Sequence, residues 1–317
     1  MEKVGIIGAS GFIGSYITKL FLEKDFWVKA SVTNLNNSEK YKHLTNFSNA
    51  VNLRIQSLRL ENLTSVKTFV KDCSILIHCG TPFQLETENP DKEMFEPTVK
   101  GTENVLKAIC ELPSIKKVVF VSSVAAYNTS FPYPAGNQDE HHVYSENDEP
   151  YFFAGDNPYA LAKYHANKLV ENFINTNKNL WFDVVSISPV AVMGKALSNR
   201  KDSTSIALQH FIKNKITQNP FIQSLFESDT SFAVVDVEDV AYGIYKAAIT
   251  EGIHGKNYLL SSESWSISDI SLLLNNKTPV GIPKIFYNNS LAKADLGINF
   301  KSAKAFLKNL NPEYNEV

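Results

Sequence analysis

The sequence predicts a doubly wound α/β fold, in which helices cover both faces of a mainly parallel sheet, followed by a smaller C-terminal α/β lobe. Over residues 3–188, short runs of β-branched and apolar residues alternate with segments whose apolar residues recur at helical spacing. The strand segments are almost continuously apolar, which is typical of a sheet buried on both faces. A glycine-rich turn joins the first strand to the first helix.

The elements follow one another from the N-terminus. The apolar run 3–7 ends at a glycine and is expected to be the first strand. Four apolar residues recur at helical spacing over 13–24, which predicts the first helix. The asparagine-rich segment 34–52 is expected to be a connection with one short helix. The further expected strands are 26–32, 53–58, 74–79, 117–122 and 182–188, and the further expected helices are 63–71, 97–111 and 158–175.

The alternation breaks twice in the second half of the chain. Residues 130–157 are rich in proline, aromatic and acidic residues, and a connection of this length is usually functional or mobile. After Gly194 the rhythm changes, and a larger domain over 1–190 is expected to give way to a lobe over 191–317. A strand and a helix near 232–250 are expected to contribute to the larger domain. The elements expected after Gly194 are helices at 206–215 and 267–274 and short strands at 232–235 and 256–260.

Composition and charge exclude several classes of function. The chain has 317 residues, of which 44% are hydrophobic and 20% charged, as in a globular protein. Its net charge of −2 provides no bulk positive field for nucleic acid or an anionic membrane. No apolar run reaches the ~20 residues that span a bilayer. Cys73, Cys79 and Cys110 show no metal spacing, which, with no leader pattern, predicts a reduced, cytoplasmic protein.

Gly8, Gly11 and Gly14 lie between the first strand and the first helix, the context in which a glycine pattern binds phosphate. Gly8 permits the tight turn, Gly11 lets a pyrophosphate approach the backbone, and Gly14 lets the helix pack on the strand. The amides of Phe12 and Ile13 are expected to face the phosphates at the positive end of the helix dipole. The alternative is a tight turn without a ligand.

Tyr159 and Lys163 lie one helical turn apart at the start of the helix expected at 158–175. The helix dipole and the ammonium both favour a phenolate, so the pKa of Tyr159 is expected below its usual value of about 10. Such a phenol donates a proton near neutral pH, and Ser123, at a strand end, supplies a hydrogen bond to the substrate oxygen. Singly, each residue is more typical of packing or of a solvated surface, but together they favour catalysis.

These motifs resemble the extended branch of the short-chain dehydrogenase/reductase superfamily, the NAD-dependent epimerase/dehydratase proteins. The spacing of the three glycines, the serine pair at 122–123, and Tyr159 with Lys163 carry the resemblance. Segments 79–82, 99–105, 188–194 and 235–241 also match the superfamily, and 42–44, 81–82 and Thr98 most resemble its dihydroflavonol reductase and cinnamoyl-CoA reductase group.

The resemblance implies a Rossmann domain that binds a nicotinamide dinucleotide and a lobe that binds a small-molecule substrate. It implies hydride transfer between the cofactor and a carbonyl or secondary alcohol of a medium-sized organic compound. Tyr159 would be the acid or base, with Ser123 and Lys163 beside it. The cofactor-binding residues that it implies are Gly8, Ser10, Gly11, Phe12, Ile13, Gly14, Thr33, Lys40, Leu60, Cys79, Thr81, Tyr159, Lys163, Pro189 and Val192.

The end of the second strand bears on the choice between NADP(H) and NAD(H). A carboxylate there binds the ribose diol of NAD and repels a 2′-phosphate. This chain has Thr33-Asn34 instead, and Lys40 matches a phosphate-binding cation of the reductase group. These residues favour NADP(H), with NAD(H) and a merely solvated Lys40 as the alternative. Arg59 replaces an adenine-contacting Asp of the superfamily, and it either reaches the 2′-phosphate or points into water.

Two other functions are kept as alternatives. A nucleotide-sugar epimerase or dehydratase with bound NAD shares the fold and the catalytic set, but Thr33 and Thr98 depart from its usual Asp and Asn. A non-catalytic dinucleotide-sensing regulatory protein commonly loses the tyrosine or lysine that this chain keeps. The resemblance also implies a homodimer through the helices at 97–111 and 158–175, although some members are monomers.

Several further residues are weighed for the pocket. His141 and His142 lie in an acidic loop without further ligand spacing, so no metal site is expected. His78 and His165 are expected to be structural. Phe83 is expected to line the substrate pocket above the strand ends. The aromatic residues of the long loop either line the pocket or anchor the loop, namely Phe131, Tyr133, Tyr144, Tyr151, Phe152 and Phe153.

Overall fold

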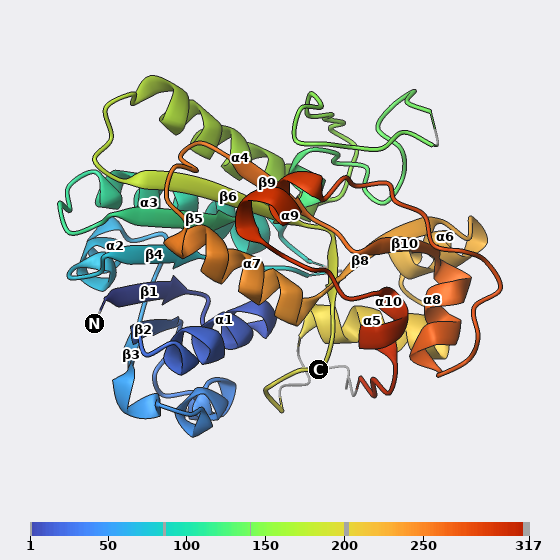
Figure 1. The fold of residues 1–317 in the computed structure, drawn as a ribbon, viewed down its shortest axis with the longest axis horizontal. Coiled ribbons are helices and arrows are strands. Elements are labelled where there is room, and N and C mark those ends of the chain that lie inside the picture. Colours follow the sequence, from blue (N-terminus) through green and yellow to red (C-terminus); the bar gives the residue numbers. More distant parts are fainter. Residues whose placement is uncertain (1, 85–86, 140, 200–202, 313–317) are drawn as a thin grey trace.

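The computed structural model describes residues 2–84, 87–139, 141–199 and 203–312 (Figure 1). A seven-stranded parallel sheet with the order β3-β2-β1-β4-β5-β6-β9 confirms the predicted fold class. The order changes direction between β1 and β4, which opens a crevice at their carboxyl ends. The strands are β1 (Lys3–Ile7), β2 (Trp27–Val32), β3 (Leu53–Ser57), β4 (Ile75–His78), β5 (Lys117–Val121), β6 (Asp183–Pro189) and β9 (Asn257–Leu260).

Helices cover both faces of this sheet (Figure 1). On one face α1 (Phe12–Glu23) and α7 (Val237–Ile249) bury their apolar sides in one core cluster with the strands. On the other face α2 (Leu63–Val70), α3 (Gly101–Ile109) and α4 (Pro158–Thr176) bury a second cluster. The almost continuous apolar strands are explained by these two layers, because side chains on both sides of each central strand leave water.

The lobe is built on a three-stranded sheet with the order β10-β8-β7 and has a core of its own. The chain passes between the two parts more than once, because β9 joins the main sheet and α7 packs beside α1. The division near residue 190 stays a prediction. The remaining elements are β7 (Ala191–Met193), α5 (Thr204–Asn214), α6 (Pro220–Glu227), β8 (Ser231–Asp236), β10 (Glu263–Ser266), α8 (Ile267–Leu274), α9 (Ser290–Leu296) and α10 (Ala303–Leu307).

Two local expectations differ from the structure. The helix expected from Pro97 begins earlier, with a π-helical stretch, η4 (Asp91–Lys100), that contains Pro97 and continues into α3. Proline has no N–H to donate, and the wider π-turn accommodates that loss inside the helix. The second difference is in the connection 34–52, which holds three 3-10 turns instead of one short helix, namely η1 (Ser38–Lys40), η2 (Lys42–Asn46) and η3 (Ala50–Asn52).

Within the described residues, no helix is both long and apolar enough to cross a bilayer.

Candidate active site

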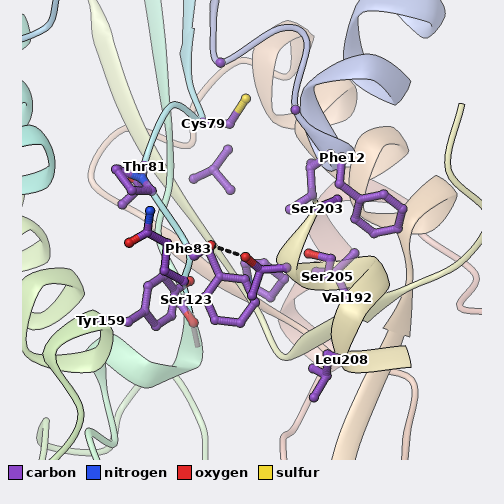
Figure 2. A pocket seen from close by; sticks show the side chains of 18 of the residues that line it. Phe12, Cys79, Thr81, Phe83, Ser123, Tyr159, Val192, Ser203, Ser205 and Leu208 are labelled. Carbon is purple, nitrogen blue, oxygen red and sulfur yellow. Dashed lines mark hydrogen bonds between the residues drawn. The ribbon is translucent and has the colours of Figure 1, made fainter. Parts of the chain in front are cut away.

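A cavity of about 580 Å³ lies at the carboxyl edge of the main sheet, with walls from both parts of the molecule (Figure 2). The walls come from the glycine turn, the loops after β4 and β5, the start of α4, and lobe residues around β7 and α5. Doubly wound sheets bind ligands at this place, where the strand order reverses. The predicted site residues that line it are Gly8, Ser10, Gly11, Phe12, Ile13, Gly14, Lys40, Cys79, Thr81, Ser123, Tyr159, Lys163, Pro189 and Val192.

The glycine turn allows a close approach to the backbone. Gly8 adopts φ +80°, and its carbonyl oxygen accepts a hydrogen bond from Gly11 N at 3.0 Å. A Cβ atom at Gly14 would lie 2.0 Å from the Gly8 carbonyl oxygen, so only glycine lets α1 pack this closely on the turn. Gly11 is the N-cap of α1 and has no side chain to cap it, which leaves the first-turn amides available to a ligand. These features fit a pyrophosphate, whose oxygens accept hydrogen bonds from such amides.

The start of α4 places two of the catalytic candidates. Asn157 caps the helix, since its side-chain oxygen accepts a hydrogen bond from Ala160 N at 2.9 Å, and Pro158 follows in the first turn. Tyr159 therefore lies in the first turn, and Lys163 follows one turn later on the same side. Both side chains line the cavity.

Lys163 is held beneath the cavity by two protein oxygens. Its Nζ donates to Val121 O at 3.0 Å and to Thr81 Oγ1 at 3.2 Å, and it lies 6.0 Å from the centre of the Tyr159 ring. Ser123 follows the end of β5, and its Oγ accepts a hydrogen bond from the next turn while the side chain faces Tyr159 (Figure 2). The structure thus brings the three predicted catalytic residues together.

The predicted fall in the pKa of Tyr159 is wrong. Burial raises the pKa of the Tyr159 phenol to about 12, and a hydrogen bond with Ser123 offsets this only in part. Burial also lowers the pKa of Lys163 to about 8, because the enclosed site disfavours the ammonium. Desolvation depends on distant parts of the chain, which the local spacing does not reveal. At neutral pH the site therefore holds a protonated phenol beside a largely charged lysine.

The predicted adenosine contacts are only partly gathered at the cavity. Lys40 lines it from the end of η1. Thr33 and Leu60 do not belong to the described lining of the cavity. Thr33 is exposed, and the Leu60 carbonyl oxygen accepts a hydrogen bond from Asn104 Nδ2 at 2.8 Å. Arg59 is exposed. The roles of these residues in cofactor binding stay predictions.

Apolar side chains line the other end of the cavity, called here the apolar end: Phe83, Phe131, Leu208, Phe221 and Phe232. The Phe83 ring centre lies 4.7 Å from that of Tyr159, and Phe131 packs on Phe232 at 5.6 Å. Thr204 Oγ1 donates to the Phe83 carbonyl oxygen and joins the lobe to the loop after β4. Figure 2 shows Phe83, Ser123 and Tyr159 grouped together, with Leu208 across the cavity.

The sequence pattern located only part of the apolar end. Phe83 lines the cavity as predicted, and Phe131 is the one member of the loop aromatics among the described lining residues. Others of this set pack elsewhere, for example Tyr144, whose ring stacks on Tyr287. Thr204, Leu208, Phe221 and Phe232 were missed. Of these four, only Leu208 lies in the segment 206–215, whose amphipathic spacing predicts a helix but does not tell which of its residues meet a cavity.

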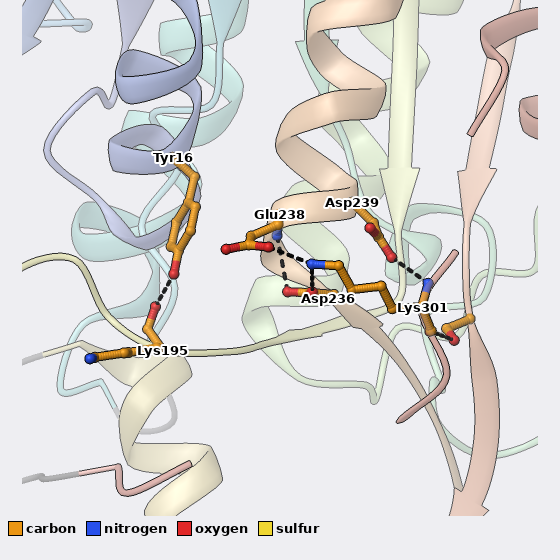
Figure 3. Close-up of polar contacts among 7 residues, drawn as sticks. Tyr16, Lys195, Asp236, Glu238, Asp239 and Lys301 are labelled. Carbon is orange, nitrogen blue, oxygen red and sulfur yellow. Dashed lines mark hydrogen bonds and ion pairs between the residues drawn. The ribbon is translucent and has the colours of Figure 1, made fainter. Parts of the chain in front are cut away.

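The segment that follows Val192 and the end of β7 is held by two hydrogen bonds, of which Figure 3 shows the one between Tyr16 and Lys195. On one side Tyr16 OH, from α1, donates to Lys195 O at 2.6 Å. On the other side Gly194 N donates to Gln209 Oε1, from α5, at 3.1 Å. These bonds connect the cavity wall to both parts of the molecule.

An ion-pair network supports the neighbouring β8–α7 junction (Figure 3). Asp236 caps α7 by accepting a hydrogen bond from Glu238 N at 3.1 Å, and it pairs with Lys301 Nζ at 2.7 Å. Lys301 also pairs with Glu238, and its backbone N donates to Asp239 Oδ2 at 2.8 Å. The segment 235–241 therefore has a structural role, since it joins the C-terminal segment to the lobe sheet.

The histidines weighed for function contact neighbouring protein groups. His142 Nε2 lies 2.6 Å from Asp148 Oδ1, and the exposed His165 packs on Phe152. His78 is buried against Phe120. In the part of the chain that the structure describes, no group of three or more His, Cys, Asp or Glu side chains is placed to hold a metal.

Comparison with known proteins agrees with this geometry. The model of the NAD dependent epimerase/dehydratase family matches residues 4–261. Dihydroflavonol 4-reductase from Arabidopsis thaliana is 27% identical over 95% of this chain and 78% of its own length. Cinnamoyl-CoA reductase from Medicago truncatula is 30% identical over 79% of this chain and 74% of its own length. The predicted resemblance to this group is confirmed, and the similar reductases favour neither the epimerase nor the sensor.

Solved structures share the fold. A yeast methylglyoxal/isovaleraldehyde reductase complexed with NADPH has a TM-score of 0.79 at 23% identity and is matched over 96% of both chains. Vestitone reductase from alfalfa has a TM-score of 0.72 at 22% identity, over 97% of this chain and 96% of its own. The chain belongs to the NAD dependent epimerase/dehydratase family, within the extended branch of the short-chain dehydrogenase/reductase superfamily, and is an NAD(P)-dependent oxidoreductase.

Proposed function

We propose that this protein uses NADPH to reduce an uncharged ketone or aldehyde of medium size, with Tyr159 as the proton donor. The observation that carries the proposal is the meeting of Ser123, Tyr159 and Lys163 at one cavity with the glycine turn. A phenol, a hydroxyl and an ammonium at the same site suit proton transfer to a carbonyl oxygen.

Each residue has a defined part in the reaction. A bound reduced nicotinamide supplies the hydride for the carbonyl carbon. Tyr159 donates its proton to the carbonyl oxygen, and its pKa of about 12 keeps that proton in place beforehand. Ser123 donates a hydrogen bond to the same oxygen. Lys163, charged below a pH of about 8, stabilises the phenolate that remains, and in the reverse oxidation Tyr159 is the base.

The preference for NADPH rests on the cation at the cavity wall. Lys40 lines the cavity on the η1 side, and no carboxylate side chain is among the described lining residues. A lysine there would pair with a 2′-phosphate, whereas a carboxylate would repel it. The fold neighbour from yeast was solved with NADPH, which supports the same cofactor here.

Lys40→Glu is expected to lower kcat/KM for NADPH by about tenfold or more, because a carboxylate repels the phosphate that the ammonium attracts. The value for NADH should change by less than about threefold. Lys42→Glu is the matched control, since Lys42 is exposed, pairs with Glu39 and lies outside the described lining. Equal losses with both cofactors, or an equal effect of the control, would remove Lys40 from the proposal.

The substrate is proposed to be uncharged because of what faces it. Lys40 and Lys163 are the only charged side chains among the described lining residues. The apolar end is lined by Phe83, Phe131 and other apolar side chains, together with neutral polar groups such as Ser205. A carboxylate or phosphate placed against these apolar side chains would lose hydration that they cannot replace.

A neutral aryl aldehyde is therefore expected to be reduced with a kcat/KM about a hundredfold or more above that of the same aldehyde bearing a carboxylate on its ring. Consumption of NADPH at its absorbance band measures both rates. Comparable rates for the two aldehydes would contradict the uncharged substrate, and conversion of a nucleotide sugar without net NADPH consumption would instead support an epimerase.

Pairing of two copies through η4–α3 and α4 stays a prediction.

A further inference from the structure

A second, much smaller cavity lies beside the main one and shares Thr81, Val121, Ser122 and Lys163 with its lining. Its volume is about 20 Å³, which is enough for one water molecule. It is lined by the elements that carry Lys163 and its hydrogen-bond partners. The other lining residues are His78, Thr102, Phe120, Ala166, Asn167 and Val170.

His78 is the polar group of this cavity that the protein leaves unsatisfied. Its side chain is 4% exposed, and Nδ1 has no hydrogen-bond partner among the residues that the structure describes. Burial, with the nearby charge of Lys163, lowers the pKa of His78 to about 3, so the imidazole is neutral and one ring nitrogen is an acceptor. Native proteins commonly satisfy such a buried group with an internal water.

The other polar groups complete the set that one water needs. Ser122 Oγ donates its proton to Asn167 Oδ1 at 3.0 Å, so it offers only lone pairs to the cavity. Thr102 Oγ1 likewise donates to Thr98 O at 2.8 Å. Lys163 Nζ gives two of its three N–H groups to protein oxygens, which leaves one. With His78 these groups offer three acceptors for the two protons of one water molecule, and the Lys163 N–H can donate to one of its lone pairs.

We propose that this cavity binds one ordered water that links His78 to the Lys163 ammonium, and that His78 is a positioning residue for the reductase reaction. The water supplies hydration to a cation that the fold has otherwise buried, so it keeps Lys163 charged and in place beside Tyr159. The kinetic consequence rests on the proposed function, whereas the water site itself rests only on the cavity and its polar walls.

Lys163 is the group whose ionisation the water affects. Three titratable groups face Lys163 in the described lining: Tyr159 on α4, and His78 and Cys79 at the end of β4. The strand β5 presents the Val121 carbonyl oxygen to it, and α3 presents the Thr102 hydroxyl to the small cavity. Burial raises the pKa of Tyr159 and of Cys79 to about 12, and burial is also the main cause that lowers the pKa of Lys163 to about 8. Of these four groups, Lys163 therefore titrates closest to neutrality, and the rate should fall as pH rises through about 8.

The test is the pH profile of carbonyl reduction by His78→Phe, in which a ring of similar shape removes both nitrogens. Without the water the Lys163 ammonium is less hydrated, so the alkaline fall should move to lower pH by about one unit. At about pH 6, where Lys163 stays charged, kcat should remain within about threefold of the original. A purely structural defect would lower kcat at every pH and leave the midpoint where it was.

Three further variants keep the test decisive. His78→Gln retains a hydrogen-bonding group and should restore most of the original midpoint. His165→Gln is the matched control, because His165 is exposed on α4 and lies outside the described lining of both cavities. If His78→Phe does not fold, Thr102→Val removes one acceptor from the cavity while keeping the shape of the side chain. An unmoved midpoint in the folded variants would overturn the positioning role.

A crystal structure of the enzyme with NADPH, at a resolution that shows ordered water, tests the site without any activity. One water within hydrogen-bond distance of His78 and Lys163 is expected in the unaltered protein, and none in His78→Phe. An empty cavity in the unaltered protein would overturn the inference even if the enzyme reduces carbonyls. Failure to reduce any carbonyl, with the water present, would instead count against the proposed function alone.

Discussion

Tyr159→Phe is expected to lower kcat for carbonyl reduction by about two to four orders of magnitude, because it removes the group that protonates the substrate oxygen. The phenyl ring should keep its packing against Phe83, whose ring centre lies 4.7 Å away. The dissociation constant for NADPH should therefore change by less than about threefold. Steady-state kinetics and NADPH fluorescence titration measure the two quantities.

Tyr164→Phe is the control for this substitution. Tyr164 lies on the same helix, its ring packs on Phe152, and it is outside the described cavity lining. Its loss of hydroxyl should leave kcat within about twofold. Retention of more than about a tenth of the activity by Tyr159→Phe would assign proton donation to another group.

Gly14→Ala is expected to weaken NADPH binding by about a hundredfold or more. A Cβ atom there would lie 2.0 Å from the Gly8 carbonyl oxygen and 2.8 Å from its carbon, both in backbone that cannot swing aside. The start of α1 must then shift, and the amides that receive the pyrophosphate shift with it. Fluorescence titration with NADPH measures the loss, and circular dichroism reports whether the variant is folded.

Gly155→Ala provides the comparison for added volume at a glycine. Its Cβ atom would meet the ring of Phe153 at 2.7 Å, but that side chain is 54% exposed and can turn away. NADPH binding should be unchanged within about twofold. Undiminished NADPH binding by folded Gly14→Ala would show that the turn is not the pyrophosphate site.

Sequence patterns located the sheet and the catalytic set because both depend on short-range signals. The strand at Lys3–Ile7 and the start of α4 at Pro158 appear in the structure as predicted. The irregular helix around Pro97 was misplaced, because the usual rule puts proline at a helix start and a π-turn provides an exception.

What was missed depends on contacts between distant segments. Phe221 and Phe232 reach the cavity from α6 and β8, and no spacing in their own segments indicates which face meets a ligand. The pKa of Tyr159 was predicted in the wrong direction for the same reason. The neighbouring Lys163 is visible in the sequence, but the burial that dominates the phenol is created by the folded molecule as a whole.

Transfer of deuterium from cofactor to product tests the central claim most directly. The enzyme would be incubated with a neutral aryl aldehyde and NADPH that carries deuterium at the transferable position of the nicotinamide, and the alcohol analysed by mass spectrometry. We expect one deuterium on the new carbinol carbon and a rate that Tyr159→Phe lowers by about two to four orders of magnitude. Protein that binds NADPH at the glycine turn yet forms no labelled alcohol from neutral carbonyl compounds would contradict the account.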